Sequence, residues 1–176
     1  MRSTMATFLL KQFLRRPLQA LRVVWSDKRP KRFHPSDCLD IPTRVWNRTT
    51  IQDLAELEIR ATNRHWSRIS IVLIRLNAGD EDRLHHMAEA LRRLVRPQTH
   101  LVGKWSASEF VVCLLDADQL TVLDFVGLLG RSCSVPFSHG ISSHSFPLAH
   151  ELGFSDLVTG ARKDMLAEGD WQPFVC

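Results

Sequence analysis

The chain has 176 residues, of which 44% are hydrophobic and 24% are charged. This composition indicates one globular domain and excludes both wholesale disorder and two full-sized domains. The net charge of +4 is unevenly distributed along the chain. Residues 1–36 carry nine Lys or Arg and one acidic residue, which gives +8, and the other 140 residues carry 14 Lys or Arg and 18 acidic residues, which gives −4. The folded body is therefore acidic, which argues against a nucleic-acid-binding domain.

Residues 1–36 are predicted to form a separate basic segment, ahead of a folded domain at residues 37–176. Apolar and basic residues recur at helical spacing up to Trp25, and Pro17 is expected to break or kink this helix. Three roles stay open for it: contact with an anionic membrane surface through residues 1–25, contact with a partner or a second copy, or packing on its own domain. The side chains expected to make these contacts are Phe8, Phe13, Arg15, Arg16, Arg22 and Trp25.

No run of residues approaches the roughly 18–20 apolar residues of a membrane span, and the opening residues make a poor secretory signal. The four cysteines (Cys38, Cys113, Cys133 and Cys176) are far apart and are expected to be reduced thiols. We therefore expect a cytoplasmic protein, either free or peripheral at the inner membrane.

The first half of the domain is predicted to contain a helix, a strand and a second helix. Apolar residues recur at helical spacing over residues 51–66, and the run Ile69–Ile74 is typical of a buried strand. A helix over residues 84–95 is expected to end before Pro97. The acidic residues 80–82 suit a solvated helix N-terminus better than a metal site.

The second half is predicted to contain a β-hairpin, a helix, a strand and a final helix. Residues 99–104 and 110–115 are the hairpin strands, joined by residues 105–109. A strand over residues 135–142 carries Pro136, which indicates an edge strand or a strand start. The last helix is expected over residues 147–167, with an interruption at Gly153 or Gly160. In the helix at 119–132, the side chains expected to face inward are Leu120, Leu123, Val126 and Leu129.

This order of elements fits an α/β (α+β) fold of the ferredoxin-like βαββαβ type, built around one sheet. Several strings, in the same order, resemble the GGDEF (diguanylate cyclase) family. Residues 40–48 (DIPTRVWNR) look like its opening D-x-L-T-x-L-x-N-R, and residues 101–112 look like its signature turn and the following strand. Residues 84–96, 138–141 and 157–165 are similar to its first core helix, its S-x-G-I/V strand and, weakly, its last helix. The resemblance implies a palm of the nucleotide cyclase type. Members of the GGDEF family dimerise face to face, and they convert GTP to cyclic di-GMP with divalent metals.

The residues that this chemistry needs are replaced. The signature turn reads Ser106, Ala107, Ser108, Glu109 and Phe110, so both glycines and one metal carboxylate are missing. Arg75 and Asn77 match the family's D-x-D, where a guanidinium would repel a metal ion by roughly 4 kcal/mol at 4 Å and intermediate dielectric. The substrate loop is also shortened to the six residues 78–83. The resemblance therefore implies an inactive domain without a metal or cofactor.

Three further groups of residues have less specific patterns. The family's product-inhibition motif R-x-x-D matches Pro97 and His100, with Arg96 one residue out of register, so Arg96 and His100 are candidate contacts for cyclic di-GMP. His85 and His86 are adjacent, point to different helix faces and indicate a surface pair. Residues 138–150 contain serines and histidines of hydrolase type without a G-x-S-x-G elbow.

Two functions stay open after these comparisons of residues. The first is a catalytically inactive regulatory or protein-interaction module in bacterial cyclic di-GMP signalling, linked to exopolysaccharide or biofilm control. Its partner would be another protein, such as a GGDEF-type or exopolysaccharide-synthesis component, or a second copy, and no nucleic acid. The alternative is a non-catalytic sensor that binds GTP or cyclic di-GMP.

Overall fold

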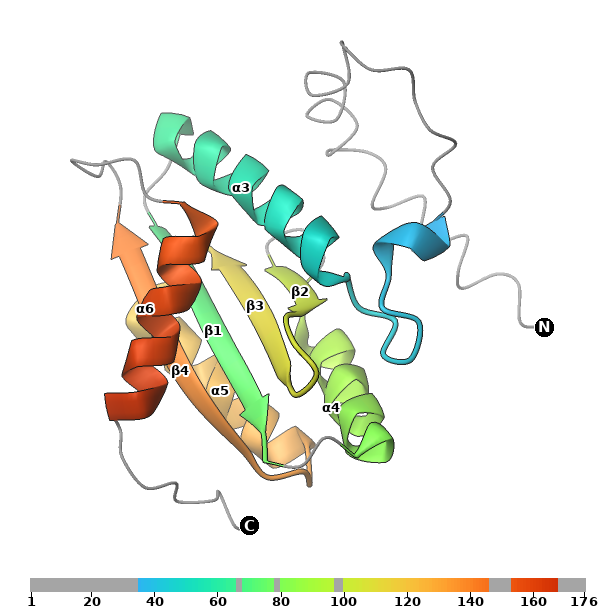
Figure 1. Ribbon diagram of the computed structural model, residues 1–176. Coiled ribbons are helices and arrows are strands. Elements are labelled where there is room, and N and C mark those ends of the chain that lie inside the picture. The colour runs from blue at the N-terminus through green and yellow to red at the C-terminus, as the bar shows by residue number, and fades with distance from the viewer. Residues whose placement is uncertain (1–34, 66–67, 78–79, 97–99, 146–152, 168–176) are drawn as a thin grey trace. The chain divides into compact units, whose positions relative to one another are not determined.

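The computed structural model describes residues 35–65, 68–77, 80–96, 100–145 and 153–167 (Figure 1). Residues 1–34 of the predicted N-terminal segment, with all six of its expected contact residues, lie outside the described residues. A short 3-10 helix at Pro35–Cys38 comes first. The helices are α3 (Arg48–His65), α4 (Glu81–Leu94), α5 (Gln119–Ser132) and α6 (Phe154–Ala167), and the strands are β1 (Arg68–Leu76), β2 (His100–Lys104), β3 (Glu109–Leu115) and β4 (Phe137–Ser145).

The four strands form one sheet in the order β2-β3-β1-β4, and every neighbouring pair is antiparallel. In β1, Ile71 lies opposite Cys113 of β3 and Ser142 of β4. Helix α4 connects β1 to β2, and α5 connects β3 to β4. This confirms the predicted ferredoxin-like βαββαβ arrangement, with α3 before it and α6 after it.

The sheet is covered on both faces, with α3 and α6 on one side and α4 and α5 on the other (Figure 1). Successive residues of a strand point to opposite faces. In β1, Ile71 and Leu73 therefore pack in the α3–α6 core, and Val72 and Ile74 pack in the α4–α5 core. Burial on both faces explains why residues 71–74 of β1 are all apolar and do not alternate with polar residues.

The loop before α3 covers the outer edge of β2. Trp46 donates its N–H to the carbonyl of Val102 (3.2 Å) and accepts the N–H of Lys104 (2.8 Å). Asn47 then caps α3, because its Oδ1 accepts the N–H of Thr50 at 3.0 Å. The string 40–48 is thus a structural motif that closes a sheet edge and starts a helix.

The inward face of α5 was predicted wrongly in part. Leu120 and Leu123 are 73% and 47% exposed, and the buried residues are Val122, Phe125, Val126 and Leu129. The helix carries apolar residues on more than one face, so spacing alone could not decide which face packs on the sheet.

The predicted interruption of the last helix is wrong at Gly160, and Gly153, the other predicted position, lies directly before α6. Helix α6 begins at Phe154 and continues through Gly160, where an added Cβ would lie 2.6 Å from Oγ of Ser142. Gly160 is therefore used for close packing on β4 and not for a break. Residues 146–152, the first part of the predicted helix, lie outside the described part of the chain. The expectation for Pro136 is confirmed, because β4 starts at the next residue and is an edge strand.

Candidate functional site

The candidate site lies at the β2–β3 turn, beside the end of β1. Residues 105–108 connect the two strands, and Trp105 and Ser106 both donate their N–H groups to the carbonyl of Glu109, at 2.8 and 3.3 Å. Glu109 is the first residue of β3 and lies directly opposite Arg75 of β1. The turn therefore places the Glu109 carboxylate next to the end of the central strand.

Both oxygens of the Glu109 carboxylate are engaged. Oε1 accepts from Nε and Nη2 of Arg75, at 3.1 and 2.8 Å. Oε2 accepts from Nη2 of Arg162 on α6, at 2.7 Å, and from Oγ of Ser106, at 3.0 Å. The Glu109 side chain is only 6% exposed, whereas the side chains of Arg75 and Arg162 are 36% and 41% exposed. A buried carboxylate thus holds together β1, the hairpin turn and α6.

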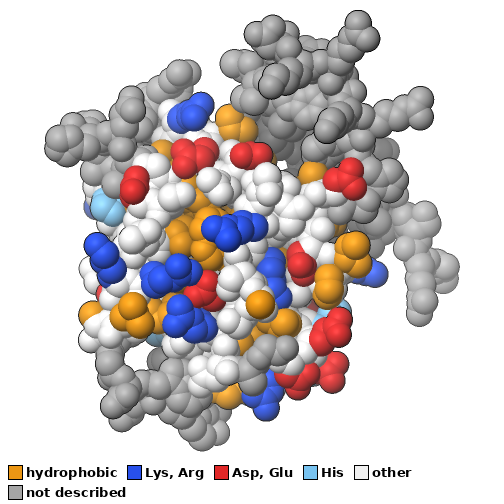
Figure 2. Space-filling view, viewed as in Figure 1, with side chains coloured by type: hydrophobic (Ala, Val, Ile, Leu, Met, Phe, Trp, Pro, Cys, Tyr) orange, Lys and Arg blue, Asp and Glu red, His pale blue; other side chains and the backbone are white. Residues whose placement is uncertain are grey.

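The two arginines keep Glu109 ionised. Burial alone would raise the pKa of this carboxyl, but the hydrogen bonds from Arg75 and Ser106 and the charges of Arg162 and Arg75 outweigh it and hold the pKa below its ordinary value. Two guanidinium groups against one carboxylate leave an excess of one positive charge. Figure 2 shows basic side chains gathered on the face of the molecule that carries α6.

Arg162 is a member of the site that the sequence did not reveal. It lies 53 residues after Glu109, and α6 bears only a weak resemblance to the family, so no spacing connected the two. The Nε of Arg162 is buried and has no hydrogen-bond partner among the described residues. One feature of α6 could have indicated Arg162. The charged residue directly follows Ala161, which is buried where the helix packs on the sheet.

The turn does not need glycine in this chain. The described non-glycine residues with positive φ are Arg44 and Asp116, and neither lies in the turn. Ser106 and Ala107, at the positions matched to the family's glycines, therefore adopt ordinary backbone angles. Trp105 and Phe110 flank the turn and are buried on opposite faces of the sheet. These two aromatic residues therefore attach the ends of the turn to the two cores of the domain.

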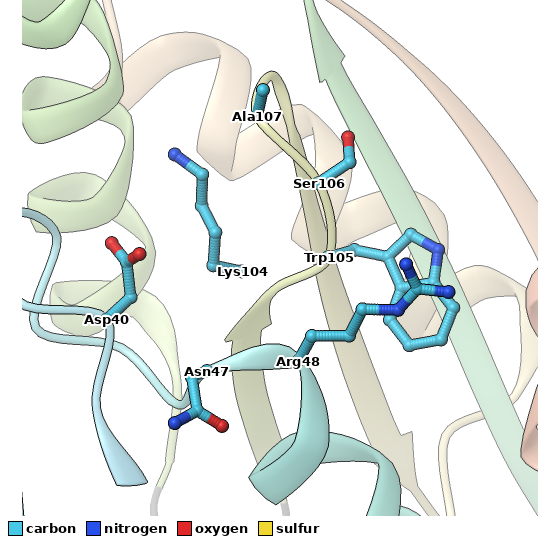
Figure 3. A pocket seen from close by; sticks show the side chains of 7 residues that line it. All are labelled: Asp40, Asn47, Arg48, Lys104, Trp105, Ser106 and Ala107. Atoms are coloured by element: carbon cyan, nitrogen blue, oxygen red, sulfur yellow. The ribbon is translucent and has the colours of Figure 1, made fainter. Parts of the chain in front are cut away.

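A pocket of about 370 Å³ lies beside the same turn (Figure 3). Figure 3 shows Arg48 lying across the indole of Trp105, with Asp40 and Lys104 away from that stack. The Arg48 guanidinium carbon is 4.5 Å from the Trp105 ring centre, and Nζ of Lys104 is 5.0 Å from that of Phe110. Burial lowers the pKa of Lys104, and the charge of Asp40 acts against this shift. The remaining lining residues are Asn47, Ser106 and Ala107.

Solved structures of GGDEF domains share this architecture. The GGDEF domain of DgcB from Caulobacter crescentus, in complex with cyclic di-GMP, has a TM-score of 0.67 at 11% identity over 80% of this chain and 92% of that chain. The diguanylate cyclase SiaD from Pseudomonas aeruginosa, in complex with its activator SiaC, has a TM-score of 0.65 at 16% identity, and the match covers 92% of this chain and 66% of SiaD. The GGDEF domain of TpbB (YfiN) from Pseudomonas aeruginosa has a TM-score of 0.58 at 22% identity, and the match covers 73% of this chain and 87% of that domain. The chain has the GGDEF fold. No family model and no curated protein matches the sequence.

Within the GGDEF fold, the two positions expected to have lost a metal carboxylate lie at the end of β1. Arg75 is bound to Glu109, as described above, and Asn77 is exposed directly after the strand. Ser108, at the third signature position, accepts the N–H of Leu76 at its backbone carbonyl (2.9 Å). No group of three or more metal-ligating side chains occurs in the described ranges.

The acidic turn before α4 caps the helix, as predicted. Asp80 is the N-cap residue, and its Oδ1 accepts the N–H of Asp82 at 3.2 Å. Glu81 and Asp82 lie in the first helical turn and are exposed. Their carboxylates therefore face solvent at the positive end of the helix dipole.

Arg96 and His100, the candidate cyclic di-GMP contacts, are bound to one another. The N–H of Arg96 donates to Nδ1 of His100 at 3.0 Å, and the N–H of His100 donates to the carbonyl of Arg96 at 2.8 Å. The His100 ring packs edge-on against Phe125, with 6.1 Å between centroids. Burial and the charge of Arg96 lower the pKa of His100. The imidazole therefore serves the local structure in its neutral form.

The remaining predicted groups have structural contacts. The predicted His85 and His86 pair is exposed, and Nδ1 of His85 lies 3.3 Å from the carbonyl oxygen of Pro42. Oγ of Ser142 lies 3.4 Å from Nε2 of His144, two residues along the same strand, and His150 lies outside the described residues.

The three cysteines that the structure describes, Cys38, Cys113 and Cys133, are free and buried. Burial raises the pKa of Cys113 and of Cys133. Among the described helices, none has the length and hydropathy of a membrane span.

Proposed function

We propose that this chain is a catalytically inactive, GGDEF-like regulatory module that acts in cyclic di-GMP signalling by binding other proteins. The observation that carries the proposal is the engagement of both Glu109 oxygens by Arg75 and Arg162. Divalent metals such as Mg²⁺ require free carboxylate oxygens near the phosphates. A metal could bind Glu109 only by competing with the charge-assisted hydrogen bonds that Arg75 and Arg162 donate to its two oxygens.

The replacement of the family's first metal carboxylate by Arg75 supports the same conclusion. A guanidinium cannot be deprotonated in a protein, so the positive charge at this position is permanent. The position that would hold a cation in an active relative is thereby filled by a cation of the chain itself. The hairpin keeps its shape because Arg75 replaces the electrostatic partner of the buried carboxylate.

A turnover assay tests the loss of catalysis. The full chain is incubated with GTP and Mg²⁺ or Mn²⁺, and cyclic di-GMP, pyrophosphate and GDP are separated chromatographically, with SiaD as the active reference. We expect none of the three products above the background. Formation of cyclic di-GMP that disappears in Glu109→Gln, but persists in the surface control Glu89→Gln, would show an active enzyme.

The interaction role is supported by the fold and by one relative. SiaD, which has the same fold, is bound to a protein activator. In this chain the expected contact residues are the six named in the basic segment. A partner captured from native cells by the full chain should be lost with Arg15→Glu/Arg16→Glu and retained with Arg92→Glu. Equal capture by both variants would contradict a role for the segment.

The pocket beside the turn favours the alternative function, a sensor of GTP or cyclic di-GMP. Arg48 and Lys104 place two cations, and Trp105 an aromatic ring, around a space open to solvent, and these groups suit phosphate and base contacts. Calorimetry with each nucleotide, without metal, separates the two functions. Saturable heat that is abolished by Arg48→Gln or Arg96→Ala supports the sensor, and absence of heat with both ligands supports the interaction module.

A further inference from the structure

Helix α5 exposes an apolar outer face. Leu120, Leu123 and Leu128 are 73%, 47% and 45% exposed, and they are three of the five exposed large hydrophobic residues in the described chain. The inner face of the same helix is fully used, because its buried residues pack in the α4–α5 core. The outer leucines therefore lie outside the core of the described domain, and exposed apolar groups that gather on one face mark interaction surfaces.

The arrangement of residues on this face is specific. At 100° per residue, Leu120, Leu123, Gly127 and Arg131 form one stripe, with Asp124 and Leu128 beside it. An added Cβ at Gly127 would meet only Nη1 of Arg131, at 3.5 Å, among atoms within 4 Å. Gly127 is therefore a notch in the face, and the Arg131 guanidinium lies next to it.

The two charges of the face form no ion pair with another described residue. Asp124 and Arg131 are exposed and two helical turns apart, and the ion pairs in the described ranges involve neither of them. A face on which an acidic group at mid-helix precedes a basic group in the last turn can pair with itself when one copy is reversed.

We propose that the outer face of α5 is a homodimer interface, in which two copies of the helix cross in antiparallel orientation about a twofold axis. The axis brings Leu123 of each copy against the Gly127 notch of the other, and Arg131 of each copy within reach of Asp124 of the other. The notch at Gly127 allows the helices to approach closely, as small residues do at helix crossings. The occupant of the face is a second copy because the complementary charges come from the same helix.

This interface is independent of the proposed function, since an active or an inactive domain would dimerise equally through α5. A single pair of helices buries less area than the roughly 1,200–2,000 Å² of a stable interface. The dimer is therefore expected to be weak and to form as the protein concentration rises.

Sedimentation velocity of the full chain over a wide concentration series tests the apolar part. Leu123→Glu should raise the dimer dissociation constant by about tenfold or more, because a charge replaces a buried apolar contact. Leu166→Glu is the matched control, since Leu166 is 66% exposed on α6 and should leave the constant unchanged. Circular dichroism verifies that both variants fold.

The charged part has a more specific test. Asp124→Arg and Arg131→Asp should each weaken self-association, because each places like charges across the axis. A mixture of the two variants restores opposite charges at both ends and should associate at least as tightly as the original chain. The proposal is overturned if the chain sediments as a monomer throughout, if Leu123→Glu and Leu166→Glu act alike, or if the mixture associates no better than each variant alone.

Discussion

Arg75 and Glu109 face each other across β1 and β3, and two hydrogen bonds of 2.8 and 3.1 Å join the guanidinium to one carboxylate oxygen. Directly opposed residues of unlike charge stabilise an antiparallel strand pair. Arg162 of α6 binds the second oxygen, so the pair also fixes a helix to the sheet. The same geometry that stabilises the turn engages both oxygens of its buried carboxylate.

Glu109→Gln should destabilise the fold by about 1–3 kcal/mol. The substitution leaves two guanidinium groups close together without their counter-charge, and removal of one partner from a buried ion pair is costly, although both arginines are partly hydrated here. The measurement is the free energy of unfolding from urea titrations followed by circular dichroism. The control is Glu89→Gln, which breaks the exposed pair with Arg93 and should cost less than about 0.5 kcal/mol. Equal costs would contradict the buried network.

The stability that Glu109 provides should depend on acidity. Its pKa is lowered in the folded chain from the ordinary value of 4.5, so this contribution is complete above that value and is lost as the pH falls through the folded pKa. The difference in unfolding free energy between the original chain and Glu109→Gln should be constant at neutral pH and should shrink below about pH 4. A difference that stays constant into acid would mean that Glu109 is not held ionised.

The fold could be predicted from the sequence because its signals were local and agreed with one another. The apolar run of β1, the hairpin spacing and the position of Pro136 each indicated the observed element. The inward face of α5 could not be assigned correctly. Val126 and Leu129 were placed correctly, but Leu120 and Leu123 belong to a second apolar stripe that only the position of the helix on the sheet distinguishes.

Gly140 and Gly127 should respond oppositely to alanine. An added Cβ at Gly140 would clash with the carbonyl oxygen of Ala161 and lie 2.6 Å from the backbone N of Met165, so Gly140→Ala should push α6 off β4 and cost several kcal/mol. Gly127 has open space, and alanine there should stabilise α5 by up to about 1 kcal/mol through helix propensity. Thermal unfolding of the two variants checks the contrast, and similar shifts in melting temperature would contradict the close approach of α6.

His100 should titrate below its ordinary pKa of 6.5, because burial and the charge of Arg96 disfavour its protonated form. Since Nδ1 accepts the N–H of Arg96, the proton should reside on Nε2. Imidazole nitrogen NMR spectra of the folded chain measure both the pKa and the tautomer, and the chain unfolded in urea is the reference. A folded pKa at or above the unfolded value, or a proton on Nδ1, would contradict this arrangement.

Only some residues of the candidate site could be predicted from the sequence. Comparison of residues located the replaced positions Arg75 and Ser108 and the surviving Glu109. It did not indicate that Arg75 would bind Glu109, because cross-strand partners depend on the register of β1 and β3. Arg162 was missed altogether, since a contact between residues far apart in the chain arises only from the packing of α6 on the sheet.

The central claim is that Glu109 is held by arginines and does not serve a metal ion. Paramagnetic Mn²⁺, added to the full chain with GTP, tests it directly through selective broadening of backbone NMR signals. We predict no selective broadening at Ser108, Glu109 and Arg75, beyond the weak effect expected at the solvent-exposed acidic residues 80–82. Saturable broadening at the turn that is lost in Glu109→Gln would contradict the account.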